Sequence, residues 1–255
     1  MTVDKHGVAR MRLNRPESHN ALNPELLEML GEILQEIDRS AEIRSVELSS
    51  TGKHFCSGMD LKWLQESFES AGKALDREFY KLGVVLHQLY HLSKSTVAIV
   101  QGAAYGGGAG LACCCDIALA STGARFCFSE VRLGLIPAII SPFVIHAIGE
   151  RIARRYFLSG EVIEAREAYR IGLVHEVLDD AQISARALAL HGALSQGAPK
   201  AISRIKSLLI GTERMPLSDA TLKKTVEWLE ETRDADEARE GISAFLGKRN
   251  PNWVK

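Results

Sequence analysis

The sequence lacks the features that mark several classes of protein. Its 31 basic and 32 acidic residues give a formal net charge of −1, so no overall field attracts nucleic acid or an anionic membrane. No apolar run reaches the roughly 20 residues that a membrane span requires, and the N-terminal residues lack the apolar segment of a signal peptide. We therefore expect a soluble protein that recognises its partners through local sites.

Cysteines and cofactor motifs are also scarce. The five cysteines include the run Cys113, Cys114 and Cys115, and an odd number without framework spacing predicts no disulfides. Consecutive helical side chains point about 100° apart, so this run cannot surround one metal ion. We expect buried, reduced thiols and a cytoplasmic location. No phosphate-loop lysine, dinucleotide fingerprint or metal-ligand constellation is present, which predicts no nicotinamide, flavin or metal.

The hydrophobic pattern predicts an α/β fold with much parallel strand pairing, because strand-like and helix-like segments alternate. Asn23 and Pro24 give a helix N-cap and first turn, followed by an apolar face. That face comprises Leu26, Leu30, Ile33, Leu34 and Ile37. The expected strands are residues 8–13, 45–50, 96–100, 116–121, 125–128 and 173–178.

The C-terminal quarter reads as helical. Ser218 is a candidate N-cap, and Asp234 with Glu237 resembles a capping box that opens a last helix through Phe245. We divide the chain into a core of residues 1–190 and a helical region of residues 191–255.

Two glycine-containing turns are the most informative feature. Gly106, Gly107 and Gly108 follow the strand at 96–100, and the absence of Cβ atoms lets backbone N–H groups approach a ligand closely. A second turn, residues 55–61, follows the strand at 45–50. Taken alone, each turn is also explained by positive φ angles and tight packing.

Together with other segments, these turns resemble the enoyl-CoA hydratase/isomerase (crotonase) superfamily. The matching segments are Asn14-Arg15-Pro16, Asn20-Ala21-Leu22, Ser57-Gly58-Met59-Asp60, the glycine run, Cys115-Asp116-Ile117-Ala118, residues 128–134, Gly172-Leu173-Val174 and residues 245–249. The resemblance implies a spiral of ββα units with a helical C-terminal trimerisation region. It also implies that the amides of Met59 and Gly107 form an oxyanion hole for an acyl-CoA thioester.

The resemblance further implies one catalytic acid where hydratases of this superfamily usually have two. Glu130 matches the second acid, whereas the first falls on Gly110. A single carboxylate can take the C2 proton and return a proton to a departing β-hydroxyl. Gly110 is expected to open space beside C3. The segments 130–142 and 60–63 resemble the methylglutaconyl-CoA hydratase branch of leucine breakdown, so interconversion of 3-methylglutaconyl-CoA and 3-hydroxy-3-methylglutaryl-CoA is the favoured reaction.

Binding residues follow from the same resemblance. Those expected near CoA are Arg15, His19, Ala21, His54 and Ser57, with Phe245 and Lys248 supplied by a neighbouring subunit of a homotrimer or dimer of trimers. Candidate cations for a distal substrate carboxylate are Lys62, Arg77, Lys81, Arg132 and His146, and Trp63 and Tyr80 are candidates to line the acyl pocket.

Other functions remain open at this stage. The same scaffold supports isomerases, hydrolases and decarboxylases, because fold does not determine the reaction. A non-catalytic acyl-CoA-binding protein is a further alternative. Some relatives bind RNA through a lysine-rich helix, but here residues 25–38 carry five acidic and no basic side chains, which predicts no nucleic-acid partner.

Overall fold

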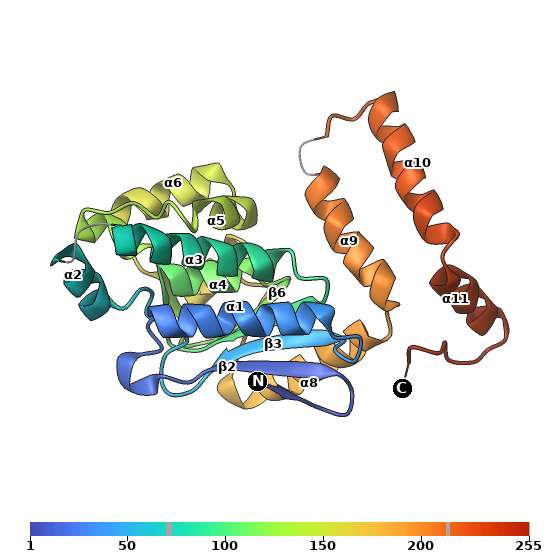
Figure 1. The fold of residues 1–255 in the computed structure, drawn as a ribbon, viewed down its shortest axis with the longest axis horizontal. Helices are drawn as coiled ribbons and strands as arrows, with labels where there is room; N and C mark the ends of the chain where they lie inside the picture. Colours follow the sequence, from blue (N-terminus) through green and yellow to red (C-terminus); the bar gives the residue numbers. More distant parts are fainter. Residues whose placement is uncertain (70–72, 213–214, 255) are drawn as a thin grey trace.

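The computed structural model describes residues 1–69, 73–212 and 215–254 and contains two sheets packed among helices (Figure 1). The larger sheet has the strand order β1-β2-β3-β4-β6-β9, and the smaller has the order β5-β7-β8. The strands are β1 (Thr2–Val3), β2 (Val8–Leu13), β3 (Ser45–Ser50), β4 (Ser95–Val100), β5 (Ala103–Tyr105), β6 (Ile117–Ser121), β7 (Arg125–Cys127), β8 (Ile163–Glu164) and β9 (Glu176–Leu178).

Parallel pairing dominates, as the sequence predicts. Strands β2, β3, β4, β6 and β9 are parallel neighbours, with Val8 opposite Ser45 and Ser45 opposite Ser95. The mixed α/β fold is thereby confirmed. The last strand is shorter than predicted. Leu173 and Val174 follow helix α7 (Ala165–Arg170), and both donate their N–H groups to the carbonyl of Ala168 in that helix. These two residues close that helix instead of starting the strand.

The helices cover both faces of the larger sheet. They are α1 (Pro24–Arg39), α2 (Leu61–Glu69), α3 (Lys73–Tyr90), α4 (Gly107–Cys114), α5 (Ser141–Ile148), α6 (Glu150–Ser159), α7 (Ala165–Arg170), α8 (Asp180–Ser195), α9 (Pro199–Thr212), α10 (Asp219–Arg233) and α11 (Asp236–Leu246), with short 3₁₀ turns η1 (Pro16–Ser18) and η2 (Ser129–Leu133). The predicted cap of α1 is confirmed, since the Asn23 side chain accepts from the Leu26 N–H at 3.0 Å. None of the helices in the described ranges is long and apolar enough to cross a membrane.

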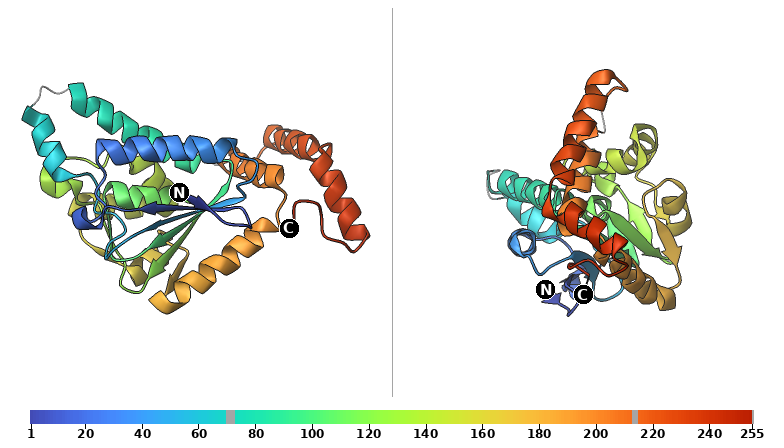
Figure 2. Two further views of the ribbon diagram at one scale, coloured as in Figure 1. Left: turned by 60° about the horizontal axis from the view of Figure 1, so that its bottom comes forward. Right: turned by 90° about the vertical axis from the view of Figure 1, so that its right-hand side faces the viewer.

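The C-terminal helices extend away from the core (Figures 1 and 2). Ser218 caps α10 as predicted, but the capping box at Asp234 and Glu237 is wrong. Ala235 occupies the N-cap of α11, Asp234 pairs with Arg233, and the Glu237 carboxylate accepts the N–H of Lys200 at the start of α9. Tertiary contact between two helices therefore replaces the local cap. The division at residue 190 stays a prediction.

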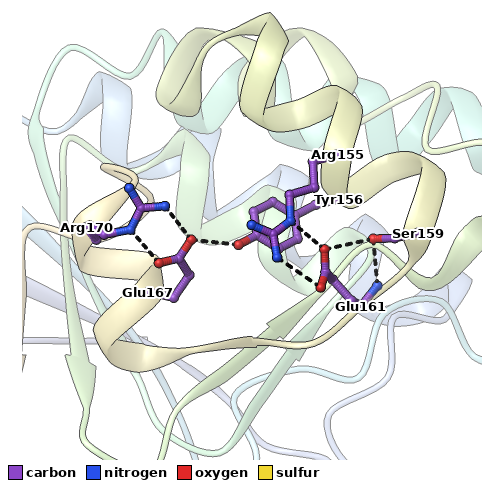
Figure 3. Close-up of polar contacts among 6 residues, drawn as sticks. All are labelled: Arg155, Tyr156, Ser159, Glu161, Glu167 and Arg170. Carbon is purple, nitrogen blue, oxygen red and sulfur yellow. Dashed lines mark hydrogen bonds and ion pairs between the residues drawn. The ribbon is translucent and has the colours of Figure 1, made fainter.

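A charged network joins α6 to the segment that follows it (Figure 3). The Tyr156 hydroxyl donates to Glu167 at 2.8 Å, and Arg155 pairs with Glu161 at 2.7 Å. The adjacent Phe157 ring packs edge-on against Phe128, with centroids 5.0 Å apart, immediately before η2. Helix α6 therefore packs against the segment that carries Glu130.

Candidate active site

The structure brings the two glycine-containing turns into direct contact. The Cys56 N–H donates to the Ala103 carbonyl at 3.0 Å, and the Tyr105 N–H donates to the Cys56 carbonyl at 2.9 Å. Gly58 and Gly106 have φ angles of +93° and +48°, values that glycine adopts without strain. A Cβ on Gly58 would stand 3.0 Å from the Tyr105 carbonyl oxygen, so the two backbones touch at this point.

Two backbone amides at this junction are available to a ligand. Met59 follows Gly58, and Gly107 is the first residue of α4; both line one cavity. Within the described part of the chain, neither the Met59 nor the Gly107 N–H donates to a protein acceptor. The Gly107 amide also lies at the positive end of the α4 dipole. Such preoriented donors favour an oxygen that gains negative charge.

Glu130 lies in the same cavity, on η2. Its Oε1 atom is 3.0 Å from the position that a Cβ on Gly106 would occupy, and its Oε2 atom is buried without a hydrogen-bond partner. Burial raises the pKa of the Glu130 carboxyl, although its own backbone N–H opposes the shift. An acid with a raised pKa both accepts and donates protons more readily near neutral pH.

The cavity has a volume of about 390 Å³ and walls that are mostly hydrocarbon. Leu61 and Leu64 from α2 and Phe79 and Leu82 from α3 form one wall. The segment 133–140 forms another, with Leu133, Leu135, Ile136, Pro137, Ala138, Ile139 and Ile140. Apolar walls with few polar groups are typical of sites that enclose a small organic ligand.

The expectation that Gly110 opens space beside the reacting carbons is wrong. Gly110 does not line the cavity, and a Cβ at this position would lie 2.6 Å from Cγ2 of Ile140. The Ile140 side chain, 2% exposed, already fills this volume. Whether Gly110 contributes to catalysis stays a prediction.

Five of the expected CoA contacts cluster beside the Met59 turn. Arg15 donates to the Ala21 carbonyl at 2.6 Å and pairs with Asp60 at 3.4 Å, while the rings of His19 and His54 meet edge-to-face at 4.9 Å. The Ser57 N–H donates to the His19 carbonyl at 3.0 Å. Burial, His19 and Lys53 lower the pKa of His54. CoA binding by these residues stays a prediction.

Phe245 and Lys248 lie elsewhere. Phe245 is 83% exposed near the end of α11, and Lys248 follows it in a left-handed conformation with φ of +51°. Figure 1 places α11 at the opposite end of the chain from α2, whose Leu61 and Leu64 line the cavity. Contact between these two residues and CoA stays a prediction.

The two aromatic candidates for the acyl pocket lie outside the cavity. Trp63 and Tyr80 do not line the cavity, and Tyr80 is 74% exposed; their neighbours Leu64 and Phe79 point inward instead. The spacing of Leu61 with Leu64 and of Phe79 with Leu82 would have indicated the inward faces. These wall residues are the functional positions that the sequence analysis missed.

None of the five candidate cations belongs to the cavity lining in the described ranges. Lys81 pairs with Glu78 at 3.0 Å. Arg132 is exposed, and its Nε atom lies 3.1 Å from the position of a Cβ on Gly160, at the end of α6. His146 packs edge-on against Tyr90. Lys62 and Arg77 are exposed on the two helices that form the cavity wall, so they remain the candidates for its rim.

The five cysteines lie outside the lining of the cavity. All five cysteines are unpaired, and burial raises the pKa of Cys56, Cys113 and Cys115 to about 12. Across residues 1–69, 73–212 and 215–254, no group of three His, Cys, Asp or Glu side chains is placed to hold a metal ion.

Known proteins resemble the chain over nearly its whole length. The model of the enoyl-CoA hydratase/isomerase family matches residues 4–255. A crystal structure of an enoyl-CoA hydratase from Shewanella pealeana has a TM-score of 0.93 and 36% identity, over 99% of this chain and 94% of that one. A short-chain-enoyl-CoA hydratase of Clostridium acetobutylicum is 31% identical over 99% of this chain and 97% of its own length. An (E)-benzylidenesuccinyl-CoA hydratase of Thauera aromatica is 31% identical over 98% of this chain and 96% of its own length. The chain therefore belongs to the enoyl-CoA hydratase/isomerase (crotonase) superfamily.

Proposed function

We propose that this enzyme adds water to, or removes it from, the C2–C3 bond of an acyl-CoA with Glu130 as the single acid–base group. One observation carries the proposal: among the described residues that line the cavity, Glu130 is the only ionisable side chain, and it shares that cavity with the Met59 and Gly107 amides. Removal of a proton next to a carbonyl requires a base and a means to stabilise the resulting enolate oxygen. The Glu130 carboxylate and the two amide N–H groups supply these.

In the dehydration direction, the Glu130 carboxylate takes the proton from C2. Negative charge moves onto the thioester oxygen, where the amides of Met59 and Gly107 donate hydrogen bonds. The C3–O bond then breaks as Glu130 returns the proton to the departing hydroxyl, so water leaves and the carboxylate is restored. Hydration is the reverse sequence, and no redox cofactor or metal enters either direction.

For the acyl group we favour a short β-branched dicarboxylate, the 3-methylglutaconyl-CoA and 3-hydroxy-3-methylglutaryl-CoA pair. Hydrocarbon walls suit the branched carbon, and Lys62 and Arg77 are exposed on the helices that form one wall. A distal carboxylate at this rim would make a charge-assisted contact. Gly110 no longer supports this choice, because Ile140 occupies the space beside it.

The test compares 3-methylglutaconyl-CoA with crotonyl-CoA under the same conditions, following loss of the enoyl-thioester absorbance. A charge-assisted contact predicts a kcat/KM higher by roughly one to two orders of magnitude for the dicarboxylate. Equal or better turnover of crotonyl-CoA would remove the dicarboxylate assignment and leave the hydratase intact. A shifted double bond or released thiol without water addition would instead favour an isomerase or a hydrolase.

We also propose that a second copy of the chain completes the CoA site through Phe245 and Lys248, in a trimer or dimer of trimers. The exposure of Phe245 and of Leu222, Val226 and Leu229 on α10 supports this, since apolar surface of this kind favours association. Lys248→Ala should raise KM by about tenfold with little change in kcat, whereas the control Lys223→Ala, also exposed, should change neither. A fully active monomer by light scattering would contradict the proposal.

A further inference from the structure

The environment of Gly110 points to an acyl-selectivity residue on a distant segment. A Cβ added to Gly110 would lie 2.6 Å from Cγ2 and 3.2 Å from Cβ of Ile140, and 3.6 Å from Cδ1 of Leu86. Contacts below about 3 Å are not tolerated between carbon atoms, because packed interiors have no spare volume. Gly110 and Ile140 therefore share a single space.

Ile140 stands between that space and the cavity. It lines the cavity, whereas Gly110 does not. Gly107 and Gly110 are three residues apart on α4, so they lie on the same face of the helix one turn apart. The volume that Ile140 occupies over Gly110 is thus adjacent to the amide that receives the thioester oxygen, close to the reacting carbons.

The backbone around Ile140 is fixed by hydrogen bonds. Its carbonyl accepts the Val144 N–H at 3.1 Å, and the following Ser141 N–H donates to the Pro137 carbonyl at 3.0 Å. A β-branched side chain has few rotamers to exchange between, and this one is 2% exposed. Ile140 therefore has little freedom to move aside for a larger substrate.

We infer that Ile140 is a specificity-determining residue that limits the size of the substituent at C3 of the acyl group by filling the space over Gly110. The inference rests on the proposed function, because it takes the cavity to be the acyl site. Shortening Ile140 extends the cavity towards α4 and admits bulkier groups, and a side chain at position 110 is accommodated only when Ile140 is shortened.

The first arm of the test measures selectivity. The ratio of kcat/KM for cinnamoyl-CoA to that for crotonyl-CoA should rise by at least about tenfold in Ile140→Ala and by less in Ile140→Val. Ile145→Ala is the matched control, because Ile145 lies on α5, is 39% exposed and does not line the cavity. It should leave the ratio unchanged. A ratio within about twofold of wild type in Ile140→Ala would overturn the inference.

The second arm measures coupling between the two positions. Gly110→Ala alone should lower the thermal midpoint and the affinity for crotonyl-CoA, and adding Ile140→Ala should restore both. Additive losses in the double variant would overturn the shared space. Dissociation constants of the two thioesters by calorimetry repeat the selectivity test without catalysis. If Ile140→Ala shifts the two dissociation constants in favour of cinnamoyl-CoA but neither wild type nor any variant adds water, the proposed function is refuted and the inference is supported.

Discussion

Two glutamates, the half-buried Glu130 and the buried Glu47, show what distinguishes the proposed catalytic acid from a structural one. Burial raises the pKa of both carboxyl groups. Glu130 faces a cavity beside two backbone amides, with one oxygen lacking a partner. Glu47, on the central strand β3, instead faces Arg10 and His191, each at 3.8 Å. A raised pKa therefore marks a buried acid, and the open cavity and adjacent donors mark a reactive one.

The surroundings of Glu47 contain a Ser, His and Glu set without the access that catalysis requires. The Ser45 Oγ atom is 2.7 Å from Nδ1 of His191, whose Nε2 atom is 3.8 Å from Glu47. A nucleophilic triad needs a serine that a substrate can reach, but Ser45 is only 1% exposed. This set instead joins α8 to the sheet. Residue types alone would have favoured the wrong site.

The comparison predicts opposite consequences for the same substitution. Glu130→Gln should lower kcat by on the order of 10²–10⁴ while binding of the CoA ester is retained, because the amide has the size of the acid but transfers no proton. Glu47→Gln should leave kcat within about threefold of wild type. Steady-state kinetics and calorimetry of both variants check this. Nearly unchanged kcat in Glu130→Gln, or a large loss in Glu47→Gln, would break the distinction.

The structural cluster should control stability at acid pH. Burial lowers the pKa of His191 from 6.5 to about 4, so between these values the unfolded chain binds more protons and stability falls as pH decreases. Protonation of His191 alone would lower the free energy of unfolding by about 2 kcal/mol between pH 7 and pH 4.5. Glu47 opposes it, since its raised pKa favours the folded state as pH falls; Arg10 and Asp4 also act on His191. Denaturant unfolding at pH 7 and pH 4.5 measures the difference.

His191→Gln should flatten this pH dependence, and His6→Gln, at an exposed position, is the matched control. An undiminished pH dependence in His191→Gln would assign acid sensitivity to other groups. Activity at pH 7 should be unaffected in the control.

The parts of the site that depend on local sequence were predictable. Gly58 and Gly106 lie in turns where a positive φ angle and the close approach of the two backbones require glycine. Residue type and spacing therefore predict both turns. Glu130 was identified by its segment, and the cap of α1 by Asn23. Strand β3 was found with its observed bounds because six consecutive residues fit a buried strand.

The parts of the site that depend on packing between segments were not predicted from the sequence. Which faces of α2 and α3 line the cavity depends on where the helices lie, and the candidates Trp63 and Tyr80 do not line it, whereas Leu64 and Phe79 do. The space over Gly110 is filled by Ile140, thirty positions away in the chain. The Glu237 carboxylate accepts the Lys200 N–H at the start of α9 and does not cap its own helix. The errors at Gly110 and Glu237 follow from contacts between segments that no local pattern encodes.

Exchange of the C2 protons of butanoyl-CoA in deuterium oxide tests the central claim most directly, because it requires the acid and the two amides but neither water addition nor a leaving group. Proton NMR should show wild-type enzyme and Glu47→Gln exchanging these protons, and Glu130→Gln exchanging them at least about 10²-fold more slowly. Exchange by Glu130→Gln at the wild-type rate would contradict the assignment of Glu130 as the proton-transfer group.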